Sequence, residues 1–197
     1  MEFLPGTTIY TIGHGRHPLA YFVELLKRYH IVLVCDVRSV ARSRWPQFNG
    51  AVLADALRER GIGYEHLPEC GGKAPAPPPE LARGLDRIME LAEEGPLVLM
   101  CSESQPLTKH ARQKRANCHR VGMLATPLRT RGARIIHILP DGTSNEFDDS
   151  AVPSMWYSRA GRRSRAPFAL LPGSIGSGVN LIIMDNHRHE PDLFREA

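Results

Sequence analysis

The segment ANCHR, residues 116–120, carries a thiol, an imidazole and a guanidinium side by side, as Cys118, His119 and Arg120. These groups can hold a metal ion, activate a thiolate or bind a phosphate. Asn117 is a good N-cap residue, so we expect a helix from about 118 to 131 with the triplet in its first turn. The free amides of a helix N-terminus bind anions and lower the pKa of a thiol. By itself the triplet favours a Cys118 packed in the core, with His119 and Arg120 on the surface; the alternative is a nucleophilic Cys118 beside an anion site.

The elements that must position this triplet are strands that alternate with helices. Apolar and β-branched runs predict strands at 7–12, 31–37, 62–67, 96–101 and 133–139, and helical spacing predicts helices at 18–30, 51–61, 78–95 and 118–131. This alternation predicts an α/β fold, a three-layer, mainly parallel five-stranded sheet with Rossmann-like or rhodanese-like topology. We expect residues 1–139 to form a single domain. Residues 140–197 are rich in Gly, Pro, Ser and Arg and predict a loop-rich or disordered C-terminal extension.

Ionisable or nucleophilic residues follow the first, second, third and fourth predicted strands. Open α/β sheets bind ligands at the carboxyl ends of their strands, so these residues are the candidates for chemistry. Because the ends of parallel strands meet at one edge, we expect the side chains to line one cleft. The expected catalytic residues are His14, Asp36, Glu69, Cys101 and Cys118, and the expected substrate-binding residues are Arg38, Arg42, Asn49, Gly71, His119 and Arg120.

The composition indicates a globular protein in a reducing compartment. Its 197 residues are 42% hydrophobic and 23% charged, with a net charge of +4 and a pI near 9.0. Four cysteines are too few for a disulfide scaffold, and no apolar run approaches the ~20 residues that span a bilayer. The N-terminus has no basic region followed by an apolar stretch. We expect a cytoplasmic protein with no membrane partner; the sequence does not predict its oligomeric state.

A metal site would need ligands that converge from distant positions, namely Cys101, Cys118, His119 and His14. The paired short spacings of structural zinc sites, such as C-x-x-C, do not occur in this chain. A disulfide between Cys101 and Cys118 is conceivable but has no support in the spacing either. We therefore expect no metal ion and no other cofactor.

The chain contains a series of motifs, which are, in chain order, Thr11-Ile12-Gly13-His14, Asp36-Val37-Arg38, Pro46-Gln47-Phe48-Asn49, Leu67-Pro68-Glu69-Cys70-Gly71-Gly72, the strand that ends at Cys101, Cys118-His119-Arg120 and His137-Ile138. On these motifs it resembles the family called domain of unknown function 488 (DUF488), from about residue 8 to 139. The resemblance implies a fold and a shared site, but no reaction. A weaker similarity, to rhodanese-like sulfurtransferases and related phosphatases, rests on an Asp-Val-Arg turn and a cysteine that ends a central strand. Those enzymes have an arginine six residues after the cysteine; this chain has Leu107 there, which argues against their persulfide or phosphocysteine mechanism.

Two functions remain open. The first is an enzyme that acts on a phosphate-bearing substrate, a nucleotide or nucleic acid, because clustered Lys and Arg residues suit phosphate. Its arginines would hold the anion, Cys101 or Cys118 would be the nucleophile or redox partner, and the other ionisable residues would move or orient protons. The second is a non-catalytic module that binds nucleic acid or another anion, with structural cysteines and with Asn49 bound to a base. We favour the enzyme, because a pure binder has little use for two thiols, an imidazole and two carboxylates.

Overall fold

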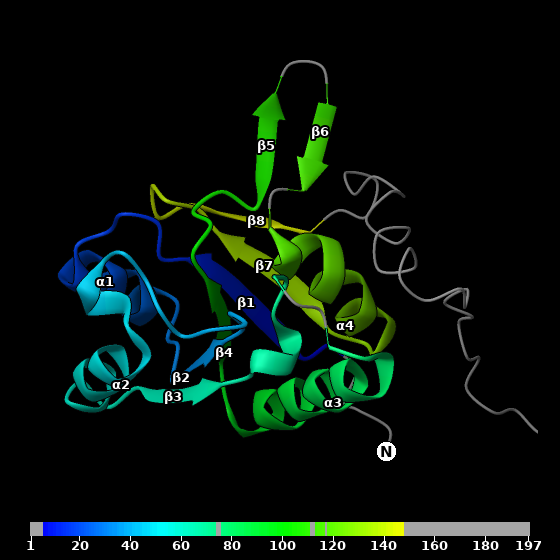
Figure 1. The fold of residues 1–197 in the computed structure, drawn as a ribbon, viewed down its shortest axis with the longest axis horizontal. Helices are drawn as coiled ribbons and strands as arrows, with labels where there is room; N and C mark the ends of the chain where they lie inside the picture. The colour runs from blue at the N-terminus through cyan, green and yellow to red at the C-terminus, as the bar shows by residue number, and fades with distance from the viewer. Residues whose placement is uncertain (1–5, 74–75, 111–112, 117, 148–197) are drawn as a thin grey trace, which may run out of the picture. The chain divides into compact units, whose positions relative to one another are not determined.

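The computed structural model describes residues 6–73, 76–110, 113–116 and 118–147 (Figure 1). Most of the predicted C-terminal extension, residues 148–197, lies outside the described residues, and so does Asn117. The division of the chain at residue 139 and the predicted N-cap therefore stay predictions. In the described part of the chain, none of the helices has the length and apolar character needed to cross a membrane.

The five strands predicted from the sequence are all present and parallel, which confirms the α/β fold. They are β1 (Thr8–Gly13), β2 (Leu33–Asp36), β3 (Gly63–His66), β4 (Leu97–Cys101) and β7 (Arg134–Ile138), and the sheet order is β3-β2-β4-β1-β7-β8.

The sheet has one strand more than predicted, because β8 (Ser144–Glu146) pairs antiparallel with β7. All three residues of β8 are polar and exposed, so no apolar pattern marks the strand in the sequence. The next residue, Phe147, is buried in the core, and its N–H donates to the carbonyl of Ile135. The sheet and its core thus continue past residue 139.

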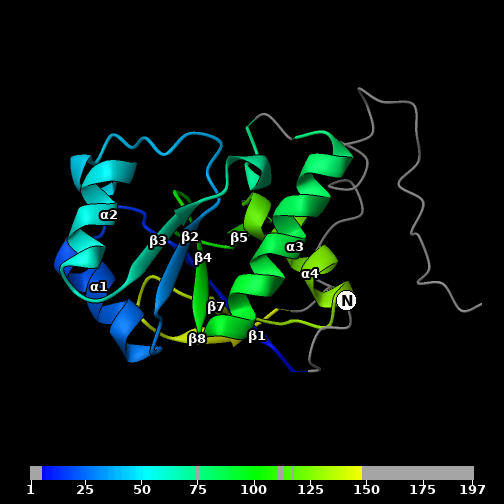
Figure 2. The same ribbon diagram turned by 90° about the horizontal axis from the view of Figure 1, so that it is seen from below.

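Helices cover both faces of the sheet and give the predicted three layers (Figure 2). α1 (Leu19–Arg28) and α2 (Gly50–Arg58) lie on one face, and α3 (Pro78–Glu94) and α4 (Thr126–Thr130) lie on the other. Neighbouring strand residues point to opposite faces, so each face has its own core. One core contains Phe22, Leu26, Leu53, Val34 and Val98, and the other contains Leu85, Ile88, Leu128, Cys35 and Leu99.

A two-stranded antiparallel ribbon interrupts the chain between β4 and the last helix, where the sequence predicted no element. It consists of β5 (Leu107–His110) and β6 (Gln113–Ala116), and Figure 1 shows it standing away from the main sheet. The ribbon's antiparallel return leads the chain back toward the carboxyl end of β4.

The helix predicted at 118–131 begins later than expected and has two parts. A π-helical segment, Arg120–Ala125, is followed by α4, so Cys118 precedes the helix rather than lying in its first turn. Pro127 stands in the first turn of α4, directly after the π-helical segment. Proline lacks an N–H and crowds the preceding turn, and a wider π turn accommodates both defects.

The carboxyl end of β4 is a topological switch point of the sheet. β4 lies between β2 and β1, whose following connections run over the face covered by α1 and α2. The connection after β4 instead leads to α4 on the opposite face. Ligand crevices form where neighbouring strands lead to opposite faces, and Cys101 ends the strand at this point.

Candidate active site

Two cysteines that are far apart in the sequence meet at the end of β4. The Sγ atoms of Cys101 and Cys118 lie 2.7 Å apart, and each residue is only 1% exposed. Cys101 is the last residue of β4, and Cys118 follows the β5–β6 ribbon. Both are free thiols within hydrogen-bond distance of one another.

His119 lies beside the two sulfurs and is held by a backbone carbonyl. Its Nε2 is 2.7 Å from the carbonyl oxygen of Val37, so Nε2 carries the proton that it donates. Nδ1 then presents its lone pair, 3.8 Å from the Sγ of Cys118. The Sγ atoms of Cys101 and Cys118 and one ring nitrogen of His119 all lie within 4.8 Å of one another, so this group can hold a metal ion.

Arg120 is a buried cation in contact with Cys118. It is 1% exposed, its Nε donates to the Sγ of Cys118 at 3.2 Å, and its Nη2 donates to the carbonyl of Glu103 at 2.6 Å. Gly13 permits this arrangement, because a Cβ there would stand 1.7 Å from the same Glu103 carbonyl oxygen. We call Cys101, Cys118, His119 and Arg120 the thiol cluster.

The pKa values of the two thiols in this cluster shift in opposite directions. Burial raises the pKa of Cys101 well above that of an ordinary thiol, and its hydrogen bond with Cys118 raises it further. Burial also opposes ionisation of Cys118, but the hydrogen bond from Cys101 and the charge of Arg120 outweigh it and hold the pKa of Cys118 well below the ordinary value. Burial raises the pKa of Cys70, which has no such neighbours, to about 12. The cluster therefore favours one thiolate, Cys118, beside one protonated thiol.

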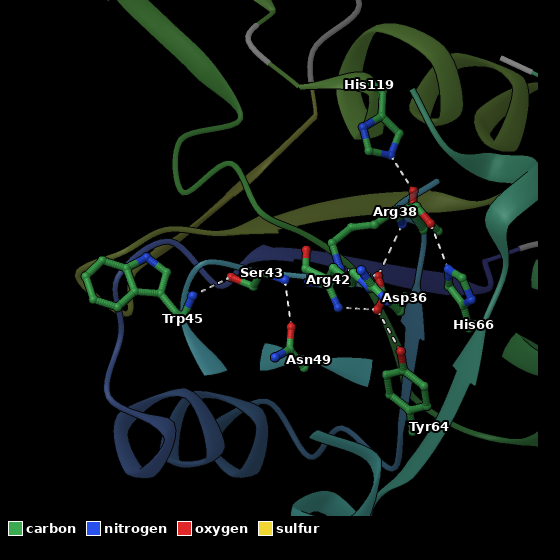
Figure 3. Close-up of polar contacts among 10 residues, drawn as sticks. Asp36, Arg38, Arg42, Ser43, Trp45, Asn49, Tyr64, His66 and His119 are labelled. Carbon is green, nitrogen blue, oxygen red and sulfur yellow. Dashed lines mark hydrogen bonds and ion pairs between the residues drawn. The ribbon is translucent and has the colours of Figure 1, made fainter. Parts of the chain in front are cut away.

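Asp36 and Arg38 form a buried ion pair at the end of β2 (Figure 3). Arg38 donates to the Asp36 carboxylate through Nε at 2.7 Å and through Nη2 at 2.5 Å, and Tyr64 donates to it at 2.7 Å. Burial acts to lower the pKa of Arg38, but the hydrogen bonds and charge of Asp36 outweigh it and raise that pKa. In this structure Arg38 bonds to Asp36 and to the Arg42 carbonyl and so positions the loop after β2; its substrate-binding role stays a prediction.

The loop after β2 contains two more of the predicted site residues. The carbonyl of Arg42 accepts a hydrogen bond from Arg38 at 3.4 Å, and the Arg42 side chain is exposed. The Oδ1 of Asn49 accepts the N–H of Ser43 at 2.9 Å, so Asn49 braces the loop (Figure 3).

His14 is a buried, neutral ring on the α1–α2 side of the sheet. It stacks on Phe48, with ring centroids 4.3 Å apart, and burial lowers its pKa to about 4. Nδ1 donates to the Gly15 carbonyl at 3.1 Å, whereas Nε2 is buried with no hydrogen-bond partner among the described residues. Its lone pair can accept a hydrogen bond, and the catalytic role of His14 stays a prediction. Phe48 is fully buried and packs beneath the loop.

The turn after β3 packs against its neighbours through its glycines. A Cβ on Gly71 would lie 2.3 Å from the Ser39 Oγ, and a Cβ on Gly72 would lie 2.6 Å from the His119 Cβ. Glu69 turns toward α3, because its Cγ lies 2.7 Å from the Cβ position of Gly84. Gly71 thus serves close packing, and Glu69 lies along α3.

The structure therefore sorts the predicted site residues into two groups. The thiol cluster lies on the α3–α4 side of the sheet, and His14 and the Asp36–Arg38 pair lie toward the α1–α2 side. Backbone contacts join them: His119 binds the carbonyl of Val37, and the His14 N–H donates to the carbonyl of Cys101 at 2.9 Å. The roles of these residues stay predictions.

Residues outside the predicted list also shape the site. His137 is 1% exposed, its Nδ1 lies 2.7 Å from the Thr11 hydroxyl, and its Nε2 has no partner within the described part of the chain. Burial lowers the pKa of His137 to about 4, and the charge of Arg120 contributes to the shift. One signal could have marked it, since a histidine inside the apolar strand ARIIHIL is unusual. Gly13 and Gly72 belong to motifs shared with DUF488, but the sequence does not show which atoms they approach.

The family model described as Domain of unknown function DUF488 matches residues 18–78, so the resemblance predicted from the sequence is confirmed over this segment. The match covers α1, β2, α2, β3 and the beginning of α3, including the Asp36–Arg38 pair. The thiol cluster lies outside it. No curated protein and no solved structure matches the chain.

Proposed function

We propose that this protein is an enzyme that acts on a phosphate-bearing substrate, a nucleotide or nucleic acid, and that the reaction takes place at the thiol cluster. The contact between Arg120 and Cys118 carries this proposal. A buried guanidinium keeps its charge, so its removal from water must be offset by an anion. No carboxylate is among the groups that interact with Arg120 in the described part of the chain, and Cys118 provides the negative charge.

Stability alone does not account for a buried thiolate–guanidinium pair. Apolar residues of similar volume usually stabilise a core at least as well as a buried ion pair. An anionic sulfur with a cation beside it, at the switch point of an α/β sheet, is an arrangement suited to chemistry on an anion. Arg120 has five N–H donors, so a phosphate oxygen can share the guanidinium with Cys118.

The surroundings of the cluster support a phosphate-bearing substrate. Arg16, Arg42 and Lys73 are exposed, and they lie in the loops that follow β1, β2 and β3. These loops lie at the carboxyl edge of the sheet, the same edge as Cys101. Positive charge at the mouth of a site raises the local concentration of anionic ligands and their rate of association.

The test is a search for product. Reduced full-length protein is incubated with a panel of nucleotides and short oligonucleotides, and products are identified by mass spectrometry. We expect product from the unaltered chain and from Cys70→Ser, but none from Cys118→Ser. Cys70 is a matched control because it is a fully buried cysteine in the turn after β3. Equal product from both folded variants would remove the reaction from the thiol cluster.

The β5–β6 ribbon favours a second candidate, a non-catalytic nucleic-acid-binding module. Its register pairs Lys109 with Lys114 and Thr108 with Arg115, which concentrates positive charge on a two-stranded ribbon. A ribbon of this kind fits the major groove of a duplex, and backbone phosphates dominate such binding. This candidate predicts salt-sensitive binding of oligonucleotides that yields no product and is unchanged in Cys118→Ser.

A further inference from the structure

The thiol cluster contains a set of metal ligands that the sequence did not favour. Two sulfurs and one imidazole nitrogen converge from the end of β4 and from the segment after the ribbon, within 4.8 Å. The spacing, one cysteine followed far along the chain by a Cys-His pair, is unlike the paired short spacings of zinc fingers. Here the β5–β6 ribbon brings the distant ligands together, because the chain leaves β4 after Cys101 and returns to it at Cys118.

Each of the three ligands is already held by a second group. Val37 accepts from Nε2 of His119 and so fixes the ring tautomer with Nδ1 available. The N–H of Glu103 donates to the Cys101 sulfur at 3.4 Å, and the Nε of Arg120 donates to the Cys118 sulfur. Protein metal sites show this pattern, in which a carbonyl orients the histidine and N–H groups support the anionic ligands. These hydrogen bonds are an observation independent of the short distances between the ligand atoms, and they support a metal site over an incidental contact of two thiols.

We infer that Cys101, Cys118 and His119 bind a divalent transition-metal ion of the zinc class and leave one coordination position for an anionic ligand. Two thiolates and an imidazole suit zinc rather than magnesium or calcium, which prefer oxygen ligands. A zinc ion with two thiolates is neutral overall, so the positive charge of Arg120 favours an anion, a hydroxide or a phosphate oxygen, as the fourth ligand. Sites with three protein ligands and one exchangeable ligand are catalytic zinc sites, whereas structural sites are closed by four.

Metal binding requires a small change in the sulfur positions. Two sulfurs bound to one tetrahedral zinc at about 2.3 Å each lie about 3.8 Å apart. The present Sγ–Sγ separation is 2.7 Å, so the two side chains must move apart on binding. Cys118 then acts as a ligand, and the fourth position of the metal becomes the reacting site of the cluster.

The test is metal titration of the reduced, full-length chain with Co²⁺ or Zn²⁺ alone. We expect one ion per chain, an absorption band from thiolate-to-Co²⁺ charge transfer, and displacement of Co²⁺ by Zn²⁺. The band reports sulfur ligands without any variant, and the variants show which of the four cysteines provide them. An absent band, or no binding under reducing conditions, would overturn the inference.

Variants then identify the ligands. Cys101→Ser, Cys118→Ser and His119→Ala should each weaken binding by more than the 10–100-fold that loss of an outer-shell partner typically costs. Gly72→Ala, which pushes a methyl group against the His119 ring, should weaken binding by about that 10–100-fold. Cys35→Ser and Cys70→Ser are the controls, because both residues are buried cysteines outside the cluster. Equal affinity in ligand and control variants would assign the ion to other groups and refute the site.

The metal titration tests the metal site independently of the proposed function, because it contains no substrate. A chain that binds Co²⁺ through sulfur but yields no product would overturn the proposed function alone. Product formation by a chain that binds no metal would overturn the metal site alone.

Discussion

Replacing Asp36 with asparagine should destabilise the protein far more than the same change at a surface ion pair. The Asp36 carboxylate is fully buried and accepts hydrogen bonds from Arg38 and from the Tyr64 hydroxyl. An asparagine at this position would keep the shape of the side chain, but it would leave the Arg38 guanidinium buried without an anion. Removing one partner of a buried pair typically costs about 3–5 kcal/mol, a large part of the 5–15 kcal/mol that stabilises a typical domain.

Asp55 provides a control with the same chemistry and nearly the same distance. The Arg58–Asp55 pair has an N–O distance of 2.6 Å, against 2.5 Å for Arg38–Asp36, but both of its side chains are mostly exposed. Two charges about 4 Å apart attract by about 1 kcal/mol in water and by about 4 kcal/mol at an effective dielectric constant of about 20. Burial and the additional hydrogen bonds to Asp36, rather than the N–O distance, therefore separate the pairs, and Asp55→Asn should cost less than about 1 kcal/mol.

Urea unfolding of both variants measures the difference. With a slope of about 2 kcal/mol per molar, a loss of about 4 kcal/mol lowers the urea midpoint by about 2 M. The double variant Asp36→Leu/Arg38→Met should recover most of the loss, because no unpaired charge remains in it. Equal losses in Asp36→Asn and Asp55→Asn, or a double variant as unstable as Asp36→Asn, would refute the reasoning.

Three further predictions concern stability. Burial lowers the pKa of His14 and of His137 to about 4, below the ~6.5 of an exposed histidine, so unfolding takes up protons between these values. The contribution of the two neutral histidines to the free energy of unfolding is therefore fully present above about pH 6.5 and should fall as the pH drops toward 4. Urea midpoints at about pH 7 and about pH 5 check this, and His137→Gln should reduce the difference between them. A midpoint that rises on acidification would contradict the prediction. Gly13→Ala should lower the unfolding free energy by about 1–3 kcal/mol in the same assay, because its Cβ would lie 1.7 Å from the Glu103 carbonyl oxygen. An unchanged unfolding free energy would contradict this, because the loop after β4 would then move aside without cost. Removal of residues 148–197 should leave a cooperative thermal transition, whereas removal of 141–197 should lower the transition temperature, since it also deletes β8 and the buried Phe147; equal temperatures for the two truncations would count against this account.

The sequence predicts those helices and strands whose buried side chains form an apolar run or stripe. β2 and β4 are continuous apolar runs because helices cover both faces, and α3 carries Leu85 and Ile88 on one buried stripe. β8 packs none of its side chains into the core, and the β5–β6 ribbon lies in a polar, basic segment, so neither has an apolar signal. The shift from α to π hydrogen bonding after Cys118 is a matter of backbone register, which apolar spacing does not encode.

The candidate site is less predictable, because chain position at a strand end does not determine which partner a side chain meets. The sequence predicts that Arg38 binds a substrate, whereas in the structure its guanidinium and its backbone N–H both donate to Asp36, two residues before it. The contact between Cys101 and Cys118 spans 17 residues and depends on the ribbon, which no pattern predicted. Glu69 follows a strand as expected, yet the missing side chain of Gly84 gives it room against α3.

The turnover of Cys118→Ser relative to Cys70→Ser, on a substrate identified by product, tests the central claim most directly. Loss of a group that takes part in the reaction typically costs at least about 100-fold in rate. The account predicts that kcat/KM falls by at least this factor in Cys118→Ser, while Cys70→Ser stays within a few-fold of the unaltered chain, with both variants folded by circular dichroism. A Cys118→Ser chain as active as Cys70→Ser would contradict it, because the reaction would then lie away from the thiol cluster.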